Sequence, residues 1–260
     1  MNATRWRSLT VQGICAAVLL AGCGAIVVRS ISSSPAAPSG PHTVSLPMTQ
    51  LPSASAGSAG TAGSAGATLQ VRTGTPKLTI GMANLGVTGS LVRVSTPSGS
   101  PAAQLQVTGG AGPGGSALVS VSAKDAASVT VTLNTAVGWR LELASGTKQT
   151  IADLRHGRVA SIAITAGSDV LDLLLPAPRG SVPIRLAAGA SQFLLSVPHD
   201  SAVRVTAAKG AGQVSLEGAK HVAVPNGSVF TTQGWSAGAA GFDIDATAGA
   251  ARLTVTARAS

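Results

Sequence analysis

The stretch Trp139-Arg-Leu-Glu-Leu-Ala-Ser-Gly146 decides the fold, because the chain repeats its pattern four more times before the C-terminus. The four later copies end on the same residue type, at Gly167, Gly189, Gly210 and Gly249. Successive glycines are 21, 22, 21 and 39 residues apart, and the last interval holds a polar insertion from Glu217 to Gly241. A period near 20 residues indicates a stacked array of repeats. The sequence therefore predicts such an array over residues 139–260.

Apolar and polar residues alternate on both sides of each glycine. An apolar side chain stands three residues before it, at Leu143, Ile164, Leu186, Ala207 and Ala246. The alternation resumes four residues after it, at Thr150, Leu171, Phe193, Val214 and Leu253. This period predicts strands with one apolar face, and glycine suits the tight corner between two strands. One unit cannot bury its own apolar strip, so the units must stack.

Short alternating segments also occupy the first half of the chain, at Lys77–Ile80, Leu91–Val94, Ala103–Val107, Leu118–Val121 and Ser128–Leu133. Turn residues separate them, and after Val28 no stretch of ten residues has helical periodicity. We therefore expect an all-β chain that forms one stacked-strand β-solenoid, right-handed and β-helix-like. The domain is expected over residues 69–260, with the clear repeats at 139–260. A β-sandwich is the alternative.

The N-terminal segment predicts export. A short basic stretch precedes the apolar run Ile14–Cys23, as in a signal peptide. Leu20-Ala-Gly-Cys23 resembles the lipobox of bacterial lipoproteins, which implies cleavage before Cys23 and a lipid on that cysteine. Residues 1–28 are therefore predicted to be a signal peptide with a lipobox; the alternative is a single transmembrane anchor over Val11–Val28. In both cases we expect the remainder at the extracytoplasmic face of the cell membrane.

Residues 29–68 are predicted to be a disordered linker. No charged residue stands between Ser30 and Ala67, and the composition is Ser, Pro, Ala and Gly. Such a segment has too little to bury to offset the entropy of ordering. Both cysteines, Cys15 and Cys23, precede it, so the exported part has no thiol for disulfide, metal or nucleophilic chemistry.

The charge balance is weakly basic. The net charge is +9, and leaving out the three N-terminal arginines (5, 7 and 29) reduces the 18 basic residues to 15 against 9 acidic ones, or +6. The chain has no Tyr and three Phe, so stacking platforms for bases are scarce and we expect no nucleic-acid binding. A basic surface suits an anionic cell-wall polymer or lipid headgroups.

Two motifs look catalytic but lack their context. Gly234-Trp-Ser-Ala-Gly238 matches the nucleophile elbow, which requires a following helix and a later acid and histidine. All four histidines precede Ser236. The glycines at 110, 112 and 115 precede a strand pattern instead of the helix that a phosphate loop needs. We therefore expect no enzyme and no cofactor, and retain Trp235 as a candidate interaction residue.

No metal site is expected. Asp243 and Asp245 share a strand face, and Asp169 lies near Asp172, but calcium needs six to eight oxygen ligands and neighbouring repeats add no carboxylates in register.

Several segments together resemble a known family: Gly138-Trp-Arg-Leu, Ala152-Asp-Leu-Arg-His-Gly-Arg-Val159, Val182-Pro-Ile-Arg, Ala188-Gly-Ala-Ser191, Thr231-Thr-Gln-Gly-Trp235 and Phe242-Asp-Ile-Asp245. They are similar to the β-strand-repeat domains of bacterial envelope proteins, of the adhesin or toast-rack solenoid type. The resemblance implies a right-handed stacked β-architecture and an envelope location, and it supplies no catalytic residues.

Two functional hypotheses follow. The first is a membrane-tethered, non-enzymatic surface scaffold, adhesin or assembly module. The second is a module that binds an anionic cell-wall polymer or glycan through a basic face and the loop around Trp235. In addition, the last strand, Arg252–Thr256, has no following repeat to cover its edge, so we expect it to pair with another copy.

Overall fold

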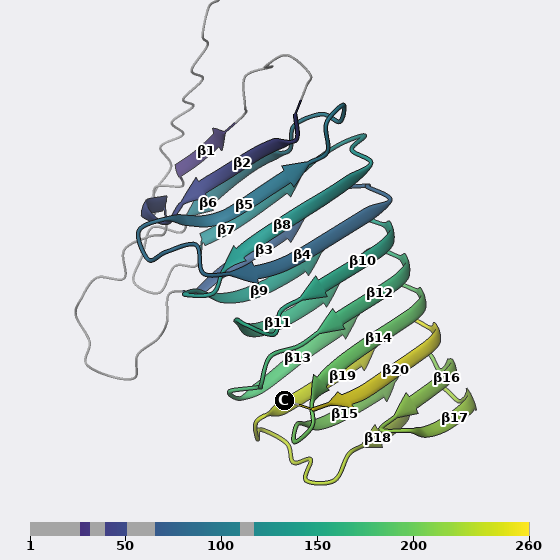
Figure 1. Ribbon diagram of the computed structural model, residues 1–260. Helices are drawn as coiled ribbons and strands as arrows, with labels where there is room; N and C mark the ends of the chain where they lie inside the picture. Colours follow the sequence, from purple (N-terminus) through teal and green to yellow (C-terminus); the bar gives the residue numbers. More distant parts are fainter. Residues whose placement is uncertain (1–26, 32–39, 51–65, 110–116, 260) are drawn as a thin grey trace, which may run out of the picture.

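Two ten-stranded sheets face each other in the computed structural model, which describes residues 27–31, 40–50, 66–109 and 117–259 (Figure 1). Within these ranges the helical structure is limited to one 3-10 turn, Met48–Gln50. The prediction of an all-β chain is confirmed. In the described ranges no helix is long and apolar enough to cross a membrane.

Each coil of the stack contributes one strand to each sheet, so the strands follow the same order of coils in both sheets. The order in the first sheet is β1 (Val27–Ile31), β6 (Gln104–Gly109), β7 (Ala117–Ser122), β3 (Gly66–Val71), β9 (Gly138–Leu143), β11 (Arg158–Ile164), β13 (Ser181–Leu186), β19 (Gly241–Ala246), β15 (Ala202–Ala207) and β18 (Ser228–Thr231). The order in the second sheet is β2 (His42–Pro47), β5 (Ser90–Thr96), β8 (Ser128–Asn134), β4 (Lys77–Ala83), β10 (Thr147–Asp153), β12 (Ser168–Leu174), β14 (Ala190–Pro198), β20 (Ala250–Arg258), β16 (Ala211–Leu216) and β17 (Ala219–Val224).

The connections are those of a solenoid. From β7 to β15 in the first sheet and from β8 to β16 in the second, neighbouring strands are parallel, and the strands outside these runs pair antiparallel. Each first-sheet strand of the parallel region leads through a corner into the second-sheet strand of the same coil. The layered core resembles that of the alternative, a β-sandwich, but parallel coils distinguish this architecture from it.

The predicted apolar positions form columns between the sheets. Leu143, Ile164, Leu186, Ala246 and Ala207 are successive partners across the first sheet, and Thr150, Leu171, Phe193, Leu253 and Val214 are successive partners across the second. All ten are buried. Trp139 is fully buried too, and its Nε1 donates to the carbonyl of Asn134 at 2.9 Å.

The corner glycines stack on one another and define one side of the molecule. A Cβ on Gly146 would lie 3.3 Å from the carbonyl oxygen of Gly167, and one on Gly167 would lie 3.4 Å from that of Gly189. We call this side, where first-sheet strands pass into second-sheet strands, the glycine edge. The opposite side, where loops 154–157, 175–180 and 199–201 lead back to the first sheet, is the return edge; the two lie on the right and left of the stack in Figure 1.

The linker predicted at 29–68 is wrong over residues 42–47. Strand β2 pairs antiparallel with β5, and its Val44 and Leu46 side chains are buried at 5% and 0% exposure. Strand β1 also enters this range and pairs with β6, and β3 begins at Gly66. The domain therefore starts earlier than residue 69, because two alternating apolar residues suffice to add a short strand to an existing sheet edge.

The prediction of a free C-terminal edge is also wrong. Strand β20, which contains Arg252–Thr256, pairs with β14 on one side and β16 on the other. The polar insertion forms the antiparallel strands β17 and β18, which end the two sheets. The chain then returns, and the coil β19/β20 occupies the place between β13/β14 and β15/β16. The free edges at this end belong to β17 and β18.

Candidate functional site

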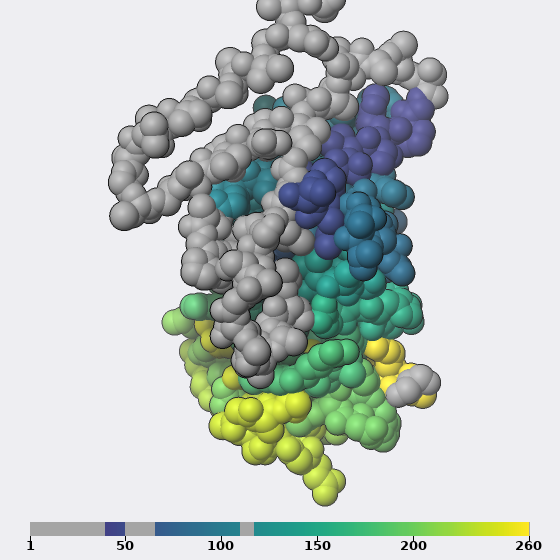
Figure 2. Space-filling view, turned by 90° about the vertical axis from the view of Figure 1, so that its left-hand side faces the viewer, coloured from purple at the N-terminus to yellow at the C-terminus, as the bar shows by residue number. Residues whose placement is uncertain are grey.

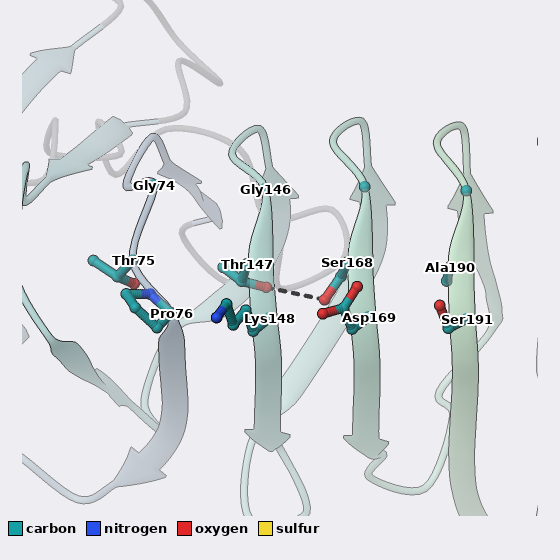
Figure 3. Close-up of a pocket in the computed structure, with 12 residues that line it drawn as sticks. Gly74, Thr75, Pro76, Gly146, Thr147, Lys148, Ser168, Asp169, Ala190 and Ser191 are labelled. Atoms are coloured by element: carbon teal, nitrogen blue, oxygen red, sulfur yellow. Dashed lines mark hydrogen bonds between the residues drawn. The ribbon is translucent and has the colours of Figure 1, made fainter.

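A shallow groove runs along the glycine edge (Figure 3). Its volume is about 560 Å³, and it extends over four corners, from Gly74 past Gly146 and Gly167 to Gly189. Because glycines form these corners, the floor is mostly backbone. Figure 3 shows Lys148, Asp169 and Ser191 at the starts of three neighbouring strands, at the same level below the corners.

Hydroxyl groups beneath this groove are already paired. The Thr147 hydroxyl lies 2.7 Å from that of Thr150 and 3.0 Å from that of Ser168, and the Ser168 hydroxyl donates to the Val170 carbonyl at 3.2 Å. Thr147, Thr150 and Ser168 are buried. A ligand in the groove would therefore contact the exposed side chains of Lys148 and Asp169 at the rim and not these buried hydroxyls.

Positive charge is concentrated on the glycine edge. Its basic residues are Arg72, Lys77, Lys124, Lys148, Lys209 and Arg252. Two carboxylates, Asp125 and Asp169, lie among them, which leaves a net charge of +4. The remainder of residues 40–259 has nine basic and seven acidic side chains, a net charge of +2. Two thirds of the net charge of this region therefore lies along one side of the stack.

The loop 232–240 carries Trp235 and packs on the outer face of the first sheet. The Arg204 guanidinium lies 5.4 Å from the centre of the Trp235 ring and binds the Asp243 carboxylate through two hydrogen bonds, of 2.8 and 2.6 Å. The hydrogen bond to Asp243 raises the pKa of Arg204. Trp235 is half-buried. The indole therefore fixes the loop against the sheet, and part of its surface stays accessible.

A second hollow lies beside this loop, on the return edge. Its volume is about 780 Å³, and its lining includes His199, Asp200, Glu217, Gln233 and Thr256. Glu217 and Gly218 form the two-residue turn between β16 and β17, with φ of 49° and 88°. This is the conformation of a type I′ hairpin turn, where glutamate is a costlier choice than asparagine or glycine. In Figure 2 the loop 232–240 protrudes at this end of the stack.

The predicted site residues have different positions. Ser236 is exposed on a turn that leads into β19, and within the described residues it has no hydrogen bond to an acid or imidazole. The Asp243 carboxylate is in an ion pair with Arg204. The described ranges contain no group of three potential metal ligands. Cys23 lies outside the described residues.

The basic face and the Trp235 loop, which the second hypothesis combines into one binding surface, lie on different edges of the stack. The Trp235 loop precedes β19 on the return edge, whereas the concentrated positive charge lies on the glycine edge. Each strand between them has about six residues, so roughly 20 Å separates the two edges. A basic face and the Trp235 loop therefore do not form one surface.

The fold has a counterpart among solved structures. A "putative cell adhesion protein" from Clostridium sporogenes superposes with a TM-score of 0.57 at 16% sequence identity. The two proteins share a fold. The match covers 83% of this chain and 98% of the other, so it extends over nearly the whole of the clostridial structure. No family model matches the sequence, and no curated protein matches it.

Proposed function

We propose that this protein is a membrane-tethered, non-enzymatic surface module that acts as an adhesin or scaffold. The observation that carries the proposal is the long two-sheet stack, in whose described strands outward-facing side chains alternate with buried ones. The fold likeness to a protein described as a "putative cell adhesion protein" supports the adhesive role. The exposed position of Ser236, without an acid or imidazole partner in the described residues, agrees with a non-enzymatic role.

The position of the first strand gives this module an orientation. Strand β1 begins four residues after Cys23, and four residues span at most about 14 Å. A lipid on Cys23 would therefore hold the β1 end of the stack close to the membrane. Ten strands per sheet at about 4.8 Å place the opposite end roughly 43 Å farther out. That outer end carries the Trp235 loop and strands β17 and β18.

The anchor is tested in intact cells that produce the full chain. We expect a radioactive lipid precursor to label the wild-type protein and not the Cys23→Ala variant. A membrane-impermeant amine reagent should label lysines of the wild type, including Lys220 on the exposed strand β17. Equal lipid labelling of both proteins, or lysines that react only after lysis, would contradict the tethered surface location.

The adhesive role needs its own measurement. Cells that display the wild-type chain should be retained on plates coated with isolated cell walls more strongly than cells that lack it. The Cys23→Ala strain is the matched control, because it produces the same domain without the anchor. Equal retention of the wild-type strain and a strain without the protein would refute adhesion.

A further inference from the structure

The glycine edge has basic side chains that the protein itself does not neutralise. Arg72, Lys77 and Lys148 are exposed, and within the described residues their side chains form no ion pair or hydrogen bond. Elsewhere on the stack two arginines are in ion pairs: Arg204 with Asp243, and Arg155 with Asp153 at 2.6 Å. The unpaired basic residues of the glycine edge are therefore available to an external anion.

Three of these residues come from two neighbouring coils. Arg72 follows β3 and Lys77 begins β4, on either side of the corner at Gly74. Lys148 lies on the next coil, and its backbone N–H donates to the carbonyl of Pro76 at 3.1 Å. Backbone pairing thus holds these residues side by side. Lys124 lies at the corner of the coil on the other side of β3/β4.

The floor beside these residues suits a narrow, extended ligand. The groove begins at Gly74 and passes Lys148, then continues over Gly167 and Gly189, so it runs along the stack. Four corners at about 4.8 Å give it a length of roughly 14 Å. Because the corner residues are glycines, a chain lying in the groove approaches the backbone closely. The charged side chains that line the groove are Lys148 and Asp169, and Arg72 and Lys77 stand on either side of its Gly74 end. Positive charge is therefore in excess at the Gly74 end.

We propose that the glycine edge binds a linear polyanion with repeated phosphate groups, which lie against Arg72, Lys77 and Lys148 at the Gly74 end of this groove. Lysine supplies a point charge and arginine a two-pronged hydrogen-bond donor, and both are suited to phosphate oxygens. The inference deepens the proposed function and rests on it for orientation. A stack that stands on its β1 end has its glycine edge perpendicular to the membrane, so this edge faces polymer and not lipid headgroups.

The test uses the full chain in neutral detergent and linear inorganic polyphosphate as the probe, with binding followed by fluorescence anisotropy. The edge variant combines Arg72→Ala, Lys77→Ala and Lys148→Ala. The control variant combines Arg93→Ala, Arg179→Ala and Lys220→Ala, which remove the same charge from exposed positions elsewhere. All six side chains are exposed, so both variants should fold, and their thermal unfolding should match that of the wild type.

We expect the edge variant to bind polyphosphate about 10-fold more weakly, because each exposed ion pair contributes roughly 1.4- to 5-fold. The slope of log affinity against log salt should fall by about 2, as expected for the loss of three phosphate contacts on a flexible polyanion. The control variant should lose less than about 2-fold, as expected for a long-range charge effect in salt.

Three results would overturn the proposal: wild-type protein that does not bind polyphosphate, equal losses in the edge and control variants, or an edge variant that loses binding only to anionic lipid vesicles. The last result would assign the edge to a membrane surface. The outcome is separable from that of the proposed function. Binding by the purified chain can hold even if the lysines prove inaccessible on intact cells, and can fail while the anchor is confirmed.

Discussion

Replacement of Leu253 by alanine tests the order of the coils. Leu253 is fully buried in β20, between Phe193 of β14 and Val214 of β16. Leucine-to-alanine changes at such sites cost about 3 to 5 kcal/mol, which combines the lost transfer free energy and the cavity left behind. In a domain of this size each kcal/mol lowers the Tm by roughly 2 to 4 °C, so we expect a decrease of about 6 to 20 °C.

The matched control is Val222→Ala on β17, the strand that ends the second sheet. Val222 is 66% exposed, so its truncation should change the free energy of unfolding by less than about 0.5 kcal/mol. Thermal unfolding of the full chain in detergent, followed by circular dichroism of the β-sheet signal, measures both variants. If Leu253→Ala destabilised the protein no more than Val222→Ala does, β20 would not be an interior strand and the coil order would be refuted.

Three further changes test particular backbone and charge features. Gly241→Ala should destabilise the fold by about 1 to 3 kcal/mol in chemical denaturation, because the new Cβ would lie 2.6 Å from the carbonyl oxygen of Ala202. Ala223→Gly should stabilise it by roughly 0.5 to 1 kcal/mol in the same assay, since Ala223 has φ of 50°; a loss of stability would contradict this. The side-chain hydrogen bond from Arg155 holds the pKa of Asp153 below its ordinary value of 3.8, so this pair contributes stability above that value, which is lost as the pH falls through the lowered pKa. The effect should stay below about 1 kcal/mol because the Asp153 carboxylate is 38% exposed, and Asp153→Asn should abolish this part of the pH dependence of the Tm.

The sequence was sufficient to predict the columns of the core. Leu143 and Ile164 occupy equivalent places before their glycines, and a strand has only two faces, so the repeat period determined which residues pair. The repeat period could not predict the order of the coils in space. Every coil has the same alternation, so the pattern does not determine which coils are neighbours. In the structure β17 and β18 end the two sheets, and β19/β20 lies between β13/β14 and β15/β16.

The strand β2 was missed for a different reason. Val44 and Leu46 are two apolar residues within a charge-free segment whose composition favours disorder. Their burial depends on β5, which lies about 50 residues later and provides the open edge to which they pair. Local composition contains no information about such a distant partner.

The basic residues of the glycine edge share a feature that is visible in the sequence. Arg72, Lys77, Lys148, Lys209 and Arg252 are scattered in the linear sequence, yet each lies within three residues of a corner glycine. Because these glycines all form corners of the glycine edge, that proximity places the five side chains on one side of the stack. The position of the Trp235 loop could not be predicted from its G-x-S-x-G pattern. The loop lies on the return edge because the chain first forms β17 and β18, which end the two sheets, and then returns to β19.

The interior position of the last coil limits how such a protein can change its length. Removal of residues from the C-terminus would not shorten the stack from its tip but would take out an inner layer and leave β15/β16 detached from β13/β14. The longest run in which consecutive coils of the chain are also neighbours in space, within the described residues, extends from β9 to β14. Duplication or deletion of whole repeats is therefore tolerated best in this middle segment, where an added layer changes the height of the protein and leaves both ends intact.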